Sequence, residues 1–273
     1  MTTHRAADCH AHVFSKKYPF ESNPPYLPDE SQQGTSEKFL AVLDAHGYTH
    51  GLLVSAGPYG ADNRCMLDAI AAAGGRFKGI ALVKPDISER ELAALDSRGV
   101  LGVRINLVGR GLKPLIEAQA GGLLARVKEM NWFVQIHCQH DDLAEAAPIL
   151  RKTGARIMVD HFGRPDVKRG VLQPGFQALL ELGKSGNSVV KLSGPFRSSI
   201  LGFPYRDVDP YIAAAINAFT LDNCVWGGDW PFVVMNERMD YGPPLTCLQR
   251  WLLDPTDRQK VLWDTPARLF GFK

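Results

Sequence analysis

WFVQIHCQHDDLAEAAPILRKTGARIMVDH, residues 132–161, carries the clearest indication of the fold. An apolar run over residues 132–138 precedes a segment of helical periodicity over residues 141–152. Gly154 is suited to end that helix, and a second apolar run covers residues 156–161. A strand, a helix and a second strand in this order are typical of a parallel βαβ unit.

The same alternation repeats along the whole chain. Eight apolar runs are expected as strands, at residues 7–14, 49–55, 77–83, 100–107, 132–138, 156–161, 188–193 and 223–229. Segments of helical periodicity separate them, at residues 36–46, 62–73, 88–97, 116–130, 141–152, 174–184 and 207–219. This pattern predicts an α/β fold, a (β/α)8 TIM barrel that forms a single domain over residues 1–273. A doubly wound open sheet is the alternative.

One connection differs from the others. Residues 15–35, after the first expected strand, are long and rich in proline, with Pro19, Pro24, Pro25 and Pro28. Proline makes such a segment stiff, and long structured loops are often lids or substrate walls. The alternative is a solvated insertion without a role.

Composition restricts the class of protein. The 273 residues are 45% hydrophobic and 22% charged, which is typical of globular proteins and excludes a disordered chain. The net charge is only +2, so no nucleic-acid partner is expected. Five scattered cysteines without a C-x-x-C pair suggest a reducing, cytoplasmic setting. Neither a signal peptide nor a membrane span is visible, so no membrane association is expected.

Polar residues collect at the carboxyl ends of the expected strands. In the first strand, alternation predicts that Asp8, His10 and His12 share one side, and that Cys9 and Ala11 share the other. The fifth, sixth and eighth strands end in polar residues as well: His137, His161 and Asp229. Buried polar groups need partners, and a barrel carries its active site at this end, so we expect one functional cluster.

Two chemistries fit this cluster. His10, His12, His137 and Asp229 could hold one divalent cation, zinc or manganese, with His161 on a bound water or the substrate carbonyl. Without a metal, the histidines could polarise a carbonyl by hydrogen bonds while Asp229 acts as general base on water. Both schemes hydrolyse an ester, lactone or amide.

Four arginines indicate the charge of the substrate. Arg104 lies on the fourth expected strand beside Asn106, and Arg110, Arg164 and Arg197 follow in loops at the same end of the barrel. Arginine binds carboxylates with two parallel hydrogen bonds and stays charged. The set predicts a small-molecule anionic substrate with two or more acid groups. For any single arginine, a surface salt bridge is the alternative.

Five motifs resemble those of the amidohydrolase superfamily, and most closely its 2-pyrone-4,6-dicarboxylate lactonases. They are DCHAH (residues 8–12), VDHFGRP (159–165), VKLSG (190–194), GGDWP (227–231) and DTPARLF (264–270), and the resemblance extends from Asp8 to Phe272. It implies a (β/α)8 barrel and hydrolysis of a lactone by an enzyme of aromatic-compound degradation.

The resemblance also implies residue roles. His10, His12 and His161 would polarise the lactone carbonyl and Asp229 would activate water. Substrate binding would fall to the four arginines, with Ser55 nearby. No metal would be required. One departure is His137, which stands where the lactonases offer a tyrosine, so His137 is assigned to substrate binding or, in the one-cation scheme, to the metal. Lys191 lies on the wrong strand to serve as the superfamily's carboxylated lysine, so two metals are not expected.

Other functions remain open. A metal-dependent decarboxylase, or another lactonase or amidohydrolase, would use the same histidines on the same barrel. A non-catalytic binding protein for aromatic breakdown products would need the arginines but not Asp229. No oligomeric state is predicted.

Overall fold

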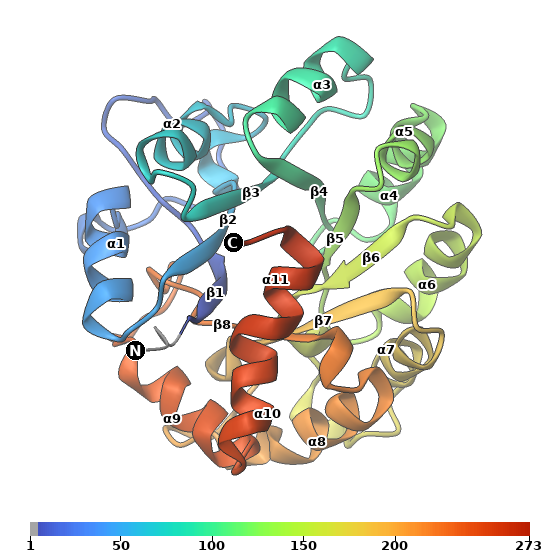
Figure 1. Cartoon of the computed structure of the whole chain (residues 1–273). Coiled ribbons are helices and arrows are strands. Elements are labelled where there is room, and N and C mark those ends of the chain that lie inside the picture. Colours follow the sequence, from blue (N-terminus) through green and yellow to red (C-terminus); the bar gives the residue numbers. More distant parts are fainter. Residues whose placement is uncertain (1–4) are drawn as a thin grey trace.

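The computed structural model, which describes residues 5–273, has eight parallel strands in one sheet, and they follow each other in chain order. Figure 1 shows the strands as an inner ring with helices outside it. The predicted barrel is confirmed. The strands are β1 (Ala7–Ala11), β2 (His50–Val54), β3 (Phe77–Ala81), β4 (Val100–Asn106), β5 (Phe133–His137), β6 (Arg156–Val159), β7 (Ser188–Ser193) and β8 (Cys224–Gly227).

The ring closes between β8 and β1, just beyond the end of β8. Ala11 and Trp230 form a parallel bridge, and the Asp229 N–H donates to the His10 carbonyl over 2.9 Å. Gly227 permits this approach, because a Cβ at that position would lie 2.6 Å from the His10 Cβ. The closure places Asp229 directly beside the histidines of β1.

Each of the seven predicted segments contains a helix, but one of them is divided, and the helices over residues 242–251 and 255–259 were not predicted. The segment predicted as one helix over residues 116–130 is two helices, separated at Gly121 and Gly122, where Gly122 has a φ of 71°. No helix in residues 5–273 has the length and apolar character needed to cross a membrane. The helices are α1 (Ser36–Ala45), α2 (Arg64–Ala72), α3 (Glu89–Ser97), α4 (Lys113–Ala120), α5 (Leu123–Glu129), α6 (Asp142–Thr153), α7 (Pro174–Lys184), α8 (Asp209–Phe219), α9 (Gly242–Trp251), α10 (Pro255–Gln259) and α11 (Thr265–Phe270).

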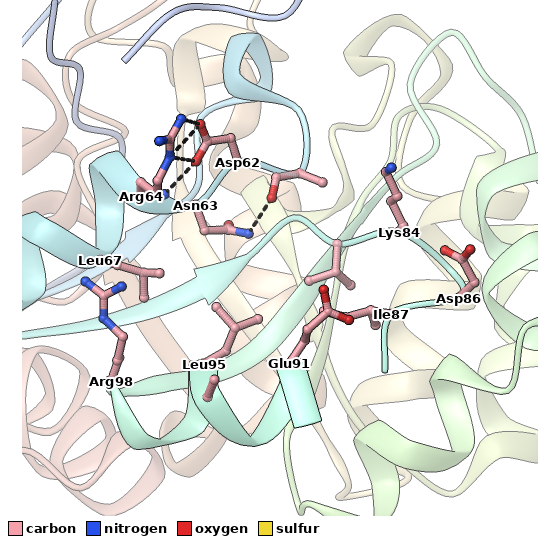
Figure 2. Close-up of a pocket in the computed structure, with 13 residues that line it drawn as sticks. Asp62, Asn63, Arg64, Leu67, Lys84, Asp86, Ile87, Glu91, Leu95 and Arg98 are labelled. Carbon is pink, nitrogen blue, oxygen red and sulfur yellow. Dashed lines mark hydrogen bonds and ion pairs between the residues drawn. The ribbon is translucent and has the colours of Figure 1, made fainter. Parts of the chain in front are cut away.

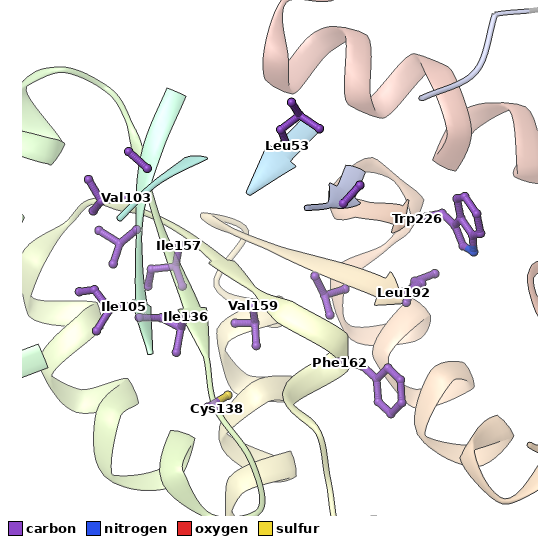
Figure 3. Packing of buried hydrophobic residues seen from close by; sticks show 14 of the residues in the cluster. Leu53, Val103, Ile105, Ile136, Cys138, Ile157, Val159, Phe162, Leu192 and Trp226 are labelled. Atoms are coloured by element: carbon purple, nitrogen blue, oxygen red, sulfur yellow. The ribbon is translucent and has the colours of Figure 1, made fainter. Parts of the chain in front are cut away.

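Two apolar clusters use opposite faces of the strands. The larger lies between the strands and the surrounding helices, and Figure 3 shows part of it, including Leu53, Ile136 and Trp226. The smaller joins the alternate strand residues, such as Leu52 and Phe133, to Phe270 of α11. Many of these residues stand early in their strands, and Figure 1 shows α11 lying across the ring. The amino-terminal end of the barrel is therefore filled and closed by apolar side chains.

The first strand departs from simple alternation. The register between β1 and β2 shifts between Asp8 and Ala11. Cys9 joins the apolar cluster inside the barrel, whereas Asp8 accepts hydrogen bonds from the Tyr241 hydroxyl over 2.7 Å and the Gly228 N–H over 3.0 Å. The prediction that Asp8 shares a side with His10 and His12 was therefore wrong, because an irregularity of this kind breaks the two-residue period of a strand.

Candidate active site

A cavity of about 760 Å³ opens at the carboxyl ends of the strands. The proline-rich loop forms part of its wall through Glu21, Pro25 and Tyr26, as predicted for residues 15–35. A short 3-10 helix at Glu30–Gln32 also lies within this loop and was not predicted. The predicted site residues among the lining are His12, Arg104, Arg110, His137, His161, Arg164, Arg197 and Asp229.

Two predicted residues are absent from that lining. His10 is fully buried beneath the cavity, and its Nε2 lies 3.6 Å from Oδ1 of Asp229. Ser55 is buried just beyond the end of β2, where its N–H donates to the Ile80 carbonyl. The structure thus brings His10 into the cluster and leaves Ser55 at its edge.

Asp229 is held on one side only. Its Oδ2 accepts a hydrogen bond from Nε of Arg197, whereas its buried Oδ1 has no hydrogen-bond partner in residues 5–273. Burial alone would raise the pKa of Asp229, but the surrounding groups, chiefly the charge and hydrogen bond of Arg197, together outweigh burial and keep the pKa below its usual range. Asp229 also has a φ of 64°, a left-handed conformation that is frequent at functional sites.

His12 has its ring orientation set by the backbone. Its Nδ1 lies 2.8 Å from the Val54 carbonyl, which can only accept, so Nδ1 carries the hydrogen. Burial lowers the pKa of His12 to about 3, so the ring is neutral near pH 7 and Nε2 presents a lone pair. This geometry disagrees with the predicted role of His12 as a hydrogen-bond donor to a carbonyl. It makes His12 an acceptor.

His161 lies beside His10, with ring centres 4.5 Å apart. Its Nδ1 lies 2.9 Å from Oγ of Ser193, and its Nε2 lies 3.9 Å from Oδ2 of Asp229. Gly194 leaves the necessary room, because a Cβ there would lie 2.7 Å from His161 Nδ1. A hydroxyl hydrogen on Ser193 directed at Nδ1 would leave Nε2–H facing the carboxylate. His161 is thereby suited to donate towards the cavity.

A buried network lies beneath these histidines, centred on Asp160, which sequence reasoning did not assign to the site. Oδ2 of Asp160 accepts from Nε of Arg104 over 2.9 Å and from Nε2 of Gln135 over 3.0 Å. Nζ of Lys191 lies 3.4 Å from the other carboxylate oxygen. Burial would raise the pKa of Asp160, but the adjacent positive charges hold it well below its usual range. The sequence did contain a signal for this network. Asp160 and Lys191 are charged residues in otherwise apolar expected strands, and buried charges need partners.

The predicted four-ligand metal set is only partly assembled. In residues 5–273, His10, His12 and Asp229 each place a ligand atom within 4.8 Å of the others, and His10, Asp160 and His161 form a second such group. His137 belongs to neither group. It lies beside both Arg164, whose NH1 is 3.4 Å from its Nε2, and His161, whose ring centre is 5.8 Å from its own.

The four predicted arginines all reach the cavity, but from different environments. Arg104 is almost buried and is tied to Asp160, and Arg197 is tied to Asp229. Arg164 is half-buried, and its Nε has no hydrogen-bond partner in the described residues. Arg110 is exposed at the mouth. Lys84 also lines the cavity and was not predicted.

A second cavity of about 570 Å³ lies beside the first, against α2 and α3, and shares Ala61, Val83 and Lys84 with it. Figure 2 shows Arg64 of this cavity paired with Asp62, and Asn63 bonded to the backbone. None of its lining residues is a histidine or cysteine. The hydrolytic chemistry expected from the sequence therefore belongs to the first cavity.

Comparison with known proteins agrees with this arrangement. The family model described as amidohydrolase matches residues 7–272. The chain belongs to the amidohydrolase family. The predicted family resemblance is confirmed over almost the whole length of the chain.

Individual relatives support the same assignment. A 2-pyrone-4,6-dicarboxylate hydrolase of Comamonas testosteroni is 32% identical, with 97% of this chain and 90% of that protein aligned. A 4-sulfomuconolactone hydrolase of Rhizobium radiobacter is also 32% identical, with the same coverage. A crystal structure from Acinetobacter baumannii, of a candidate 2-pyrone-4,6-dicarboxylic acid hydrolase with bound citric acid, has a TM-score of 0.87 and 32% identity. It covers 98% of this chain and 99% of its own.

Proposed function

We propose that this amidohydrolase is a lactone hydrolase that opens the ring of a small di-acid such as 2-pyrone-4,6-dicarboxylate or a muconolactone. The observation that carries the proposal is Asp229, which lines a cavity together with four arginines and whose buried Oδ1 has no hydrogen-bond partner in the described residues. The names of the relatives, both lactone hydrolases, support the reaction class. Bound citric acid in the related structure supports carboxylate recognition.

The proposed reaction divides the cluster into acceptors and donors. Asp229 Oδ1 takes a proton from water as the water oxygen bonds to the lactone carbonyl carbon, and Nε2 of His12 accepts the second water hydrogen. Nε2–H groups of His10 and His161 donate to the carbonyl oxygen as it gains negative charge. The ring C–O bond then breaks, and its oxygen receives the proton from Asp229. For a pyrone, the products are a carboxylic acid, which loses its remaining proton to solvent, and an enol, which rearranges to a ketone.

Arg197 couples substrate binding to the base. In the free protein its guanidinium holds Asp229 and keeps the pKa of that carboxyl low, which makes Asp229 a weak base. A substrate carboxylate that attracts Arg197 would weaken this pairing and raise the pKa of Asp229 towards working pH. The base would therefore become stronger when an anionic substrate is present.

We further propose that no metal is required. By residue type, His10, His12 and Asp229 fit one divalent cation, and His10 Nε2 and Asp229 Oδ1 are buried without hydrogen-bond partners in the described residues. However, Lys191, Arg104 and Arg197 surround these groups and oppose a further cation. A pyrone lactone is also an activated ester, so hydrogen bonds and a carboxylate base are sufficient. Activity after metal removal tests this point.

The reaction class is tested by incubating the purified protein with 2-pyrone-4,6-dicarboxylate while recording absorbance and product mass. Hydrolysis adds one water and one carboxylate, whereas the alternative decarboxylation removes carbon dioxide. A matched Asp229→Asn variant separates catalysis from binding. An enzyme loses turnover in this variant while it still binds the lactone, whereas a binding protein binds the ligand in both forms and turns over in neither. Absence of turnover on every di-acid lactone in a panel of pyrones and muconolactones would overturn the proposal.

A further inference from the structure

The buried Lys191 side chain is the strongest feature that the proposed reaction has not used. Lys191 lies on β7, is fully buried and has its Nζ within 3.4 Å of three side chains. Its Nζ lies 2.8 Å from Oε1 of Gln135, 3.2 Å from Nδ1 of His10 and 3.4 Å from Oδ1 of Asp160. An ammonium group has three N–H donors and no acceptor, so it can donate to Oε1 of Gln135 and Nδ1 of His10 while it forms an ion pair with Asp160.

The other contacts of His10 agree with this direction of donation. His10 Nδ1 also lies 3.2 Å from Oδ1 of Asp160, but that oxygen makes no hydrogen bond with any described residue. The Lys191 ammonium lies equally close to Nδ1 and has no lone pair, so a hydrogen on Nδ1 would point at another donor, and the hydrogen bond at Nδ1 is the one donated by Lys191. A neutral imidazole carries one hydrogen, so a lone pair on Nδ1 places that hydrogen on Nε2.

We infer that Lys191 is a positioning residue that fixes His10 with its hydrogen on Nε2, where it faces Asp229 and the reacting carbonyl. The inference rests on the proposed lactone hydrolysis for the identity of that carbonyl. Its structural part stands by itself, because it concerns only which ring nitrogen carries the hydrogen. His12 has the opposite arrangement of its ring hydrogen, since the Val54 carbonyl places that hydrogen on Nδ1.

The arrangement has a consequence for metal binding. A nitrogen that carries a hydrogen has no lone pair for a cation, so Lys191 removes His10 from the three-residue group of His10, His12 and Asp229. The remaining two ligands form a weak site. Lys191 therefore favours the hydrogen-bonding chemistry over a metal centre built from the same residues.

The direct test is a long-range ¹H–¹⁵N correlation spectrum of the complete protein labelled with ¹⁵N-histidine. His10→Gln and His12→Gln variants identify the two signals among the eight histidines. We expect His10 with Nε2 protonated and His12 with Nδ1 protonated. A His10 signal with hydrogen on Nδ1, or on both nitrogens, would overturn the inference. This measurement needs neither substrate nor turnover.

Lys191→Met supplies an independent readout. We expect a folded variant to bind zinc at least about tenfold more tightly, measured by competition with a chromophoric chelator, with kcat reduced about 100-fold and KM changed much less. Lys84→Met is the matched control, because it removes a cavity charge without contacting His10, and its zinc affinity and His10 spectrum should remain those of the natural protein. Equal zinc affinity in Lys191→Met and the natural protein would contradict the inference. If Lys191→Met does not fold, the spectrum of the natural protein decides.

If the natural protein hydrolyses no lactone but shows the expected His10 spectrum, the proposed function fails and the role of Lys191 in fixing the ring stands. The reverse result, turnover with hydrogen on Nδ1 of His10, leaves the function intact and removes Lys191 from it.

Discussion

The two ends of the barrel use the same strands in opposite ways. At the amino-terminal end, Phe133 packs against Phe270 of α11 with ring centres 5.6 Å apart, within an apolar cluster. At the carboxyl end, the same strand β5 finishes at His137 beside Arg164. Buried apolar area stabilises the fold, whereas crowded charges and histidines are held there for chemistry. The difference implies that stability and turnover can be changed separately.

The largest effect is expected at Asp229. Asp229→Asn removes the proposed base and should lower kcat by about 10²- to 10⁴-fold, while the apolar end of the barrel keeps the protein folded. Stopped-flow or steady-state absorbance measures the rate, and circular dichroism checks the fold. A folded Asp229→Asn protein with nearly normal kcat would show that the carboxyl end does not work as described.

The next effect is expected at the opposite end and on stability. Phe270→Ala should lower the free energy of unfolding by about 3–5 kcal/mol, since it leaves a cavity among buried side chains. Denaturant unfolding measures this loss, and kcat of the folded fraction should stay close to normal. Phe203→Ala is the matched control, because Phe203 is 52% exposed and its removal should change stability by no more than about 0.5 kcal/mol. Equal losses in the two variants would contradict the assignment of the closed end.

Within the carboxyl end, the arginines should differ according to burial. Arg164→Met should lower kcat/KM for a di-acid lactone. The loss of transition-state stabilisation should be about 2–5 kcal/mol, because a substrate charge is left unpaired. Arg110→Met at the exposed mouth should lose about 1 kcal/mol or less. A mono-acid analogue should be affected far less by Arg164→Met. Arg104 is a less clean probe, since its loss also removes a partner from Asp160. Equal losses on both substrates would exclude Arg164 from carboxylate recognition.

The smallest effect concerns pH. The reaction needs Asp229 ionised, so rates fall as pH falls through its pKa. Arg197 holds that pKa well below its usual range in the free protein, so kcat/KM should stay level over the acidic range in which the protein is folded. The proposed release of Arg197 predicts that kcat falls at a higher pH than kcat/KM. If kcat and kcat/KM fell at the same acidic pH, the proposed release of Arg197 would be excluded.

Much of this architecture follows from patterns in the sequence. Strand–helix alternation predicted the barrel, and the polar strand ends predicted which residues meet at the cavity. Alternation failed at Asp8, because a shift in register turns that carboxylate towards Tyr241. The division of helix 116–130 follows from two glycines whose effect depends on the tertiary structure.

The finer features of the site could not be predicted from spacing alone. The partner of His12 is a backbone carbonyl on β2, and backbone partners leave no sign in a sequence. The same holds for the contact between Lys191 and His10, which are 181 positions apart and meet only when the barrel closes. The hydrogen positions on the histidines depend on these contacts.

Turnover of metal-free protein is the decisive observation for the mechanism. The protein is dialysed against a chelator, its residual zinc and manganese are measured, and hydrolysis of 2-pyrone-4,6-dicarboxylate is followed by absorbance in the presence of the chelator. We predict that kcat/KM is unchanged after metal removal and does not rise when zinc or manganese is added. Complete loss of turnover in the chelator, restored by either metal, would contradict the account and reassign Asp229 from free base to metal ligand.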